Sequence, residues 1–458
     1  MLKISRVILL LVLVNICLTF GCATSNNSTT INNFHVVVFS DVHFNPFYDT
    51  TIFDSLVAAD ASQWKSIFAS SSISEPSIWG EDSNYPLFAL ALSSIKSNLT
   101  SSSVVAIFPG DILVHNFDTQ FYNLYGSQDE AAMKSFLCKT ATFFAMQVRA
   151  HLGNIPVIFE LGNNDSYEGD YKIEPNSQFL ADTAEPFYTL FLNGTADHDT
   201  FINTYETGGY YSATPLGKNL LVIALNSIFF SPKAASDTTA AATAELDWFE
   251  RALALAASSG QKVWLVTHIP AGANISSNKD LIDSNGHLDD AKMMWVEDFQ
   301  TRFLDILSAY SNTVTMIFTG HTHMDEYRLP FSALEVTPSI SPIDGNDPAY
   351  KIFTFTHDSF LITDYESFNY DLSNLSGQFN EYYNFSGLYS MNNILGVSLE
   401  ELFPLLKIDP IQQGLYKGHY YSGHDSASPI TDTNWPVYWC GISEMAQQDY
   451  MDCVNGYR

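Results

Sequence analysis

Aspartate, histidine and asparagine residues that can bind a metal ion recur in five short segments of this chain. The candidate ligands are Asp41, His43, Asp111, Asn163, His268, His321 and His323. Imidazole and oxygen donors without a thiolate suit borderline metals such as zinc, iron or manganese, and they do not match a structural zinc site. Two such ions about 3.5–4 Å apart can hold a hydroxide between them and clamp an in-line displacement at phosphorus. The residue types therefore predict a dinuclear, hydrolytic metal centre.

Each of these segments follows a short apolar run that we interpret as a buried strand. The runs begin at His35, Val104, Val157, Val263 and Val314. Ligands bind beyond the carboxyl ends of the strands in open α/β sheets, so five such ends predict one shared polar site. Each motif alone is commonplace, because an Asp-x-His is usually an ordinary strand-end pair. Only the ordered set predicts the site.

Spacing and helical pattern support this arrangement. Residues two apart on an extended segment share a face, so Asp41 and His43 can reach one cation, and Gly110 lets the backbone turn sharply before Asp111. Residues 245–256 favour a helix with apolar residues on one face. This helix lies between apolar runs at 220–225 and 263–267, which is a βαβ pattern. We therefore predict an α/β fold.

Length and charge limit the function. The chain has 458 residues, 46% of them hydrophobic, with a net charge of −30 from 20 basic and 50 acidic residues. We predict one catalytic domain over residues 34–369 and a partly helical C-terminal appendage over 370–458. The charge argues against nucleic-acid or anionic-membrane partners, but not against an anionic substrate at a metal centre.

The N-terminus predicts entry into the secretory pathway. Residues 1–23 have a basic start, an apolar stretch and a small-residue exit typical of a signal peptide, with a membrane anchor as the alternative; residues 24–33 are a polar linker. We expect no transmembrane segment in the mature chain and a secreted or lysosomal location. Glycosylation candidates are Asn98, Asn193, Asn274, Asn374 and Asn384. Cys440 and Cys453 could bridge in an oxidising compartment.

The ordered motifs resemble those of the calcineurin-like metallophosphoesterases. The resemblance implies an α/β/β/α sandwich and two divalent ions, most plausibly zinc. One ion would be held by Asp41, His43, Asp111 and His323. The other would be held by Asp111, Asn163, His268 and His321, with Asp111 bridging.

A narrower resemblance to the acid sphingomyelinase-like phosphodiesterases covers most of residues 35–458. It rests on Asp41-Val-His-Phe-Asn-Pro-Phe-Tyr48, Gly208-Gly-Tyr-Tyr-Ser, Pro338-Ser-Ile-Ser-Pro342 and Gly110-Asp-Ile-Leu-Val-His115. It implies that His115 contacts the substrate phosphate. It also implies that Cys440 and Cys453 form the C-terminal disulfide of that family.

Two departures from that family affect the substrate. The usual Gly-Asn-His-Asp/Glu is here Gly162-Asn163-Asn164-Asp165. We predict Asn164 as a catalytic residue that stabilises developing charge by a hydrogen bond, although it cannot transfer a proton at neutral pH. We also expect the lipid-presenting saposin domain of true acid sphingomyelinase to be absent. We predict a phosphodiesterase acting on sphingomyelin or a soluble phosphodiester. The alternatives are an endopolyphosphatase, a nucleotide phosphodiesterase, or a secreted glycoprotein that keeps the fold as a binding module.

Overall fold

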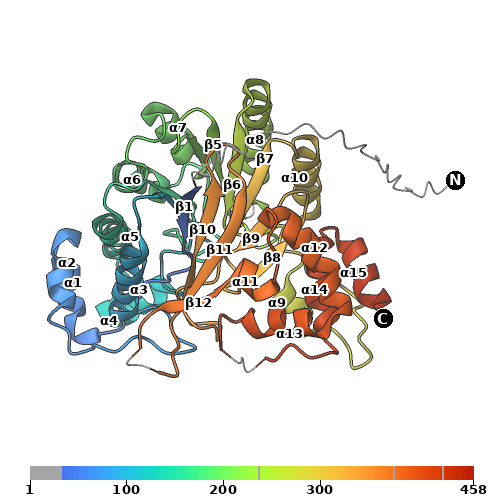
Figure 1. The fold of residues 1–458 in the computed structure, drawn as a ribbon. Coiled ribbons are helices and arrows are strands. Elements are labelled where there is room, and N and C mark those ends of the chain that lie inside the picture. The colour runs from blue at the N-terminus through green and yellow to red at the C-terminus, as the bar shows by residue number, and fades with distance from the viewer. Residues whose placement is uncertain (1–32, 236–237, 375–376, 425–427, 458) are drawn as a thin grey trace, which may run out of the picture. The chain divides into compact units, whose positions relative to one another are not determined.

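The computed structural model describes residues 33–235, 238–374, 377–424 and 428–457 of the chain (Figure 1). The predicted signal peptide lies outside these residues, as does all of the predicted linker except Asn33, which is the first residue of β1. Within the described residues, no helix is both long and apolar enough to cross a bilayer.

Two six-stranded sheets form the centre of the molecule (Figure 1). The first has the order β12-β11-β10-β1-β2-β3, and the second has the order β4-β5-β6-β7-β9-β8. The strands of the first sheet are β1 (Asn33–Val38), β2 (Ser103–Phe108), β3 (Val157–Phe159), β10 (Ala349–Thr356), β11 (Ile362–Asn369) and β12 (Asn380–Asn384). Those of the second are β4 (Tyr211–Ala213), β5 (Leu220–Leu225), β6 (Lys262–Thr267), β7 (Val314–Thr319), β8 (Glu326–Arg328) and β9 (Leu334–Val336).

The sheets pack face to face through aromatic side chains. Trp264 of β6 lies 4.3 Å from Phe355 of β10, and Phe318 of β7 lies 5.5 Å from Phe353 of β10, between ring centroids. Such rings bury large apolar areas and prefer tilted or edge-to-face contacts. This interface is the middle of the predicted sandwich.

Helices cover the outer faces. Phe108 of β2 packs on Phe144 of α5, and the residues of α8 predicted to share an apolar face (Leu246, Phe249, Leu253 and Ala256) are all buried. The helices before residue 260 are α1 (Phe53–Ala58), α2 (Trp64–Phe68), α3 (Tyr85–Asn98), α4 (Phe117–Tyr125), α5 (Glu130–Leu152), α6 (Gln178–Phe187), α7 (His198–Gly208) and α8 (Thr239–Ser259). The fold class predicted from the sequence is confirmed.

The C-terminal part is mostly helical and is joined to the first sheet through β12, which pairs with β11. The later helices are α9 (Ile275–Asn278), α10 (Glu297–Ala309), α11 (Phe385–Tyr389), α12 (Leu395–Ile408), α13 (Pro410–His419), α14 (Trp435–Ser443) and α15 (Gln447–Gly456). A disulfide between Cys440 of α14 and Cys453 of α15 links the last two helices. Cys138 is free.

Parallel pairing decides where the ligand segments meet. Strands β1, β2 and β3 are parallel, so the segments that follow them leave the first sheet at one edge. Strands β5, β6 and β7 are also parallel, so the segments after β6 and β7 leave the second sheet together. The backbone N–H of His321 donates to the Asp41 carboxylate at 3.0 Å, which joins the two edges.

Candidate metal centre and substrate pocket

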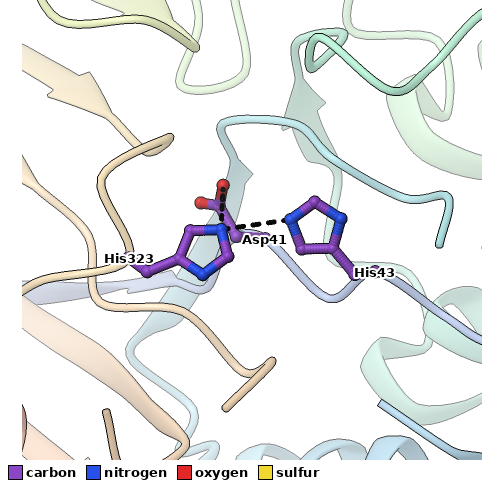
Figure 2. A group of neighbouring side chains, drawn as sticks. All are labelled: Asp41, His43 and His323. Atoms are coloured by element: carbon purple, nitrogen blue, oxygen red, sulfur yellow. Dashed lines mark hydrogen bonds and ion pairs between the residues drawn. The ribbon is translucent and has the colours of Figure 1, made fainter. Parts of the chain in front are cut away.

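The structure brings all seven predicted ligands together. Asp41, His43 and His323 have candidate ligand atoms within 4.8 Å of one another, and so do Asp41, Asp111 and His268. Figure 2 shows the first group, in which Nε2 of His323 contacts both Asp41 and His43; it is 3.5 Å from Asp41 Oδ1 and 3.1 Å from His43 Nε2. The Asn163 amide oxygen completes the second group, at 3.0 Å from His268 Nε2 and 2.8 Å from His321 Nδ1.

Asp111 connects the two groups. Its Oδ2 lies 3.4 Å from His43 Nε2 and 3.3 Å from His268 Nε2. The predicted bridging carboxylate therefore lies between one imidazole of each predicted ligand set.

The backbone at these positions is unusual. Five of the seven ligands are non-glycine residues with positive φ: Asp41 (49°), His43 (45°), Asp111 (62°), His321 (72°) and His323 (66°). This left-handed backbone conformation costs a non-glycine residue about 1 kcal/mol or more. It persists at functional sites where the surrounding fold enforces it. Gly110 has φ +114°, as expected for the sharp turn before Asp111.

Buried hydrogen bonds hold the backbone of the ligand segments in this conformation. The carboxylate of Asp165 accepts backbone N–H groups from Asp111 (3.0 Å), Ile112 (2.9 Å), Leu113 (3.1 Å) and Gly162 (2.9 Å). The segment after β2 is thereby fixed against the segment after β3. Asp165 is the last residue of the Gly-Asn-Asn-Asp motif, and sequence reasoning assigned it no role.

The pKa values of most of the titratable candidate ligands favour the protonation states that bind a cation. Burial lowers the pKa of His43 to about 4 and that of His323 to about 3, and it also lowers the pKa of His321. These rings are neutral imidazoles whose lone pairs are free for a metal. Burial alone would raise the pKa of Asp111, but His268 and His43 hold it well below its usual range. The Asp111 carboxylate in turn raises the pKa of His268 to about 9, against the effect of burial, so His268 must release a proton when it binds a metal.

His115 lies beside this centre. Its ring stacks on that of His43 with 4.2 Å between centroids, and its Nδ1 is 2.9 Å from Asp82 Oδ1. The hydrogen bond and charge of Asp82 outweigh burial and raise the pKa of His115 to about 9. Asp82 is a residue that sequence reasoning missed, because no motif surrounds it.

Asn164 faces a different space. Its amide donates to Asp111 Oδ2 at 3.2 Å, and its side chain lines a cavity of about 270 Å³ together with Tyr167, Glu168 and Asp170. His115 instead lines a larger pocket of about 400 Å³. Asp170 lines both spaces.

The larger pocket runs from the metal centre to the C-terminal part of the chain. Its lining includes Asp111, Asn163, His321 and His323, and also Tyr171, Lys233, Asn274, Lys279, Tyr420, Tyr421 and Tyr438. Asn274, a glycosylation candidate, therefore lines this larger pocket, whereas Asn193 and Asn374 are exposed and are not among its lining residues.

Comparisons with known proteins agree with this geometry. Sphingomyelin phosphodiesterase B of Dictyostelium discoideum is 24% identical over 94% of this chain and 66% of its own length. Cyclic GMP-AMP phosphodiesterase SMPDL3A of Rattus norvegicus is 23% identical over 91% of this chain and 90% of its own. Human sphingomyelin phosphodiesterase is 23% identical, with 77% of this chain aligned to 54% of that protein. The calcineurin-like phosphoesterase family model matches residues 34–325, and the chain belongs to this family.

Proposed function

We propose that the chain is a phosphodiesterase whose activity depends on two divalent ions, zinc by preference. The observation that carries the proposal is the position of Asp111 Oδ2, 3.4 Å from His43 Nε2 and 3.3 Å from His268 Nε2. One ion would be held by Asp41, His43, Asp111 and His323, and the other by Asp111, Asn163, His268 and His321. The donors are imidazole nitrogens and carboxylate or amide oxygens, and this set supports zinc.

Two ions held by these residues would supply Lewis acidity toward phosphate oxygens and toward the attacking water. The chain's own residues supply positioning and protons. His115, kept protonated by Asp82, donates a hydrogen bond to a phosphate oxygen in the pocket and stabilises the charge that develops there. Asn164 holds Asp111 in place and offers no proton of its own.

The substrate is a phosphodiester, as the names of the relatives suggest. Those names include sphingomyelin phosphodiesterases and a cyclic GMP-AMP phosphodiesterase, so both lipid and nucleotide diesters are candidates. An endopolyphosphatase is the alternative enzyme. A secreted or lysosomal location is supported by the disulfide between Cys440 and Cys453.

The test is metal content together with hydrolysis of bis(p-nitrophenyl) phosphate. We expect about two divalent ions per chain, loss of activity on chelation, and recovery on adding zinc back. Active protein without metal would contradict the proposal. Metal-loaded, folded protein that hydrolyses no phosphodiester would instead favour the binding-module alternative.

A further inference from the structure

A lysine stands beside the metal centre in a chain that is strongly acidic overall. Lys233 lies in the segment between β5 and α8 and lines the larger pocket. Its Nζ is 4.5 Å from the centroid of the Tyr171 ring and 3.5 Å from the Tyr171 hydroxyl. Lys233 forms no ion pair with any carboxylate in the part of the chain that the structure describes, although its charge acts on Asp170, which lines the same pocket. Its ammonium can therefore still donate to a ligand.

Tyr171 ties this lysine to the metal ligands. The Tyr171 hydroxyl is 3.2 Å from His321 Nε2, and its backbone N–H donates to the Asn163 carbonyl at 2.7 Å. Tyr171 has φ +59° and is buried, so its ring is held firmly. Two short contacts therefore link the Lys233 ammonium to the ring of a metal ligand.

The second lysine of the pocket, Lys279, has its charge paired with a carboxylate. Lys279, in the loop after α9, forms an ion pair with Asp280 at 3.2 Å. Of the two lysines that line the pocket, Lys233 is the one that forms no ion pair within the described residues; the carboxylate that its charge acts on is that of Asp170, which lines the same pocket.

This arrangement disfavours a cationic substrate group at this position. Quaternary ammonium groups bind over aromatic faces, but the Tyr171 face is already occupied by an ammonium of the protein. A choline group placed there would meet Lys233 and lose the aromatic contact. A phosphate placed there would gain a charge-assisted hydrogen bond.

We infer that Lys233 is a specificity-determining residue that binds a second anionic group of the substrate, next to the scissile phosphate. The inference rests on the proposed phosphodiesterase activity and narrows its substrate class. The preferred substrates carry a second phosphate, as phosphorylated nucleotides and phosphoanhydrides do. Zwitterionic phosphocholine esters are disfavoured.

Three substrates with one leaving group test this. They are thymidine 5′-(p-nitrophenyl phosphate), the same ester with a 3′-phosphate, and p-nitrophenylphosphorylcholine. In wild-type protein we expect the 3′-phosphate to raise kcat/KM. Lys233→Gln should lower kcat/KM on the 3′-phosphorylated ester about tenfold. It should change kcat/KM on the thymidine ester that lacks the 3′-phosphate less than about twofold. Its kcat/KM on p-nitrophenylphosphorylcholine should be equal to or higher than that of wild type. Lys233→Arg should retain most of the preference.

The matched control is Lys218→Gln, which removes the same charge from an exposed position before β5, at the strand end opposite the site. It should leave all three rates unchanged. An equal loss on both thymidine esters in Lys233→Gln, or no loss on the phosphorylated one, would overturn the inference.

A binding measurement separates this inference from the proposed function. If wild-type protein hydrolyses none of the esters, the proposed function fails. Calorimetric titration of metal-loaded protein with thymidine 3′,5′-bisphosphate and thymidine 5′-monophosphate then decides on Lys233. Tighter binding of the bisphosphate that is lost in Lys233→Gln supports the anion subsite, and equal binding of both nucleotides by wild-type protein rejects it.

Discussion

Asp82 holds His115 by two contacts, one to the ring Nδ1 at 2.9 Å and one to the backbone N–H at 3.2 Å. The first contact fixes a proton on Nδ1 and leaves Nε2 for the pocket that His115 lines. Asp82 itself is buried, and although burial alone would raise its pKa, the hydrogen bond and charge of His115 lower it. In the proposed mechanism His115 is an acid beside the candidate metal centre, and Asp82 is its positioning residue.

Removing the Asp82 charge should lower the pKa of His115, which Asp82 raises to about 9. If protonated His115 is the active form, activity falls as pH rises through that pKa. Asp82→Asn should then move the alkaline limb of the kcat/KM profile to lower pH and lower the maximum about tenfold or more. The measurement is the pH–rate profile with bis(p-nitrophenyl) phosphate. A uniform loss with an unmoved alkaline limb would assign Asp82 a purely structural role.

Asp111→Asn should abolish most activity while the fold is kept, because an amide is a poor bridge between two cations. We expect a loss of about 10³-fold or more in kcat, and fewer than two ions retained per chain. Circular dichroism and elemental analysis accompany the rate measurement. Full activity with a normal metal content would exclude the bridging role.

Asn164→His tests whether the chain lacks an acid for the leaving group. Protonation matters most when the leaving group is basic. The variant should therefore raise turnover of an alkyl phosphodiester more than that of a p-nitrophenyl ester. A parallel change on both substrates, in either direction, would argue against an acid role at this position.

Gly320 has no room for a side chain. An added Cβ would lie 2.4 Å from Asp41 Oδ2, so Gly320→Ala should displace a predicted metal ligand and lower both metal content and activity, activity by about 10–100-fold. The matched control is Gly396→Ala in α12, where the nearest atom would be 3.9 Å away. It should keep wild-type activity. Normal metal binding in Gly320→Ala would show that the loop can shift without loss.

Stability should depend on pH through a buried glutamate. Burial, reinforced by the charge of Glu160, raises the pKa of Glu245 well above 4.5. The folded protein therefore holds this proton more tightly than the unfolded chain. The resulting contribution to the free energy of unfolding is fully present below pH 4.5 and is lost as the pH rises toward the folded-state pKa. Glu245→Gln should therefore raise Tm relative to wild type at pH 7.5, by about 2 °C or more, and much less at pH 4.5.

The control for this titration is Glu206→Gln in α7, an exposed site. It should leave the pH dependence of Tm unchanged. A Glu245→Gln curve parallel to that of wild type would mean that this carboxyl keeps its charge in the folded protein.

The candidate ligand set could be predicted from the sequence because the information is local. A buried β-strand shows as a short apolar run, and the residue after its carboxyl end is defined by position alone. Asp41, Asp111, Asn163, His268 and His321 were found in this way. The buried face of α8 was predicted by the same kind of argument, from its helical period.

The sequence could not identify residues that reach the site through tertiary contacts. Asp82 lies far from any predicted strand end and meets His115 only because the segment before α3 packs against the segment after β2. Tyr171 and Lys233 meet across 62 positions of the chain, and Tyr420, Tyr421 and Tyr438 line the pocket from a part of the chain predicted to be an appendage.

The sequence by itself determined the α/β class, the family and the donor atoms of the candidate metal centre, since strand ends and donor atoms are properties of short segments. Only the tertiary structure decided how His115 is oriented, which charges face the substrate and which cavity Asn164 lines. These depend on distances between segments that no periodicity or motif encodes, and they arise when the two sheets pack together and bring their strand ends to one place.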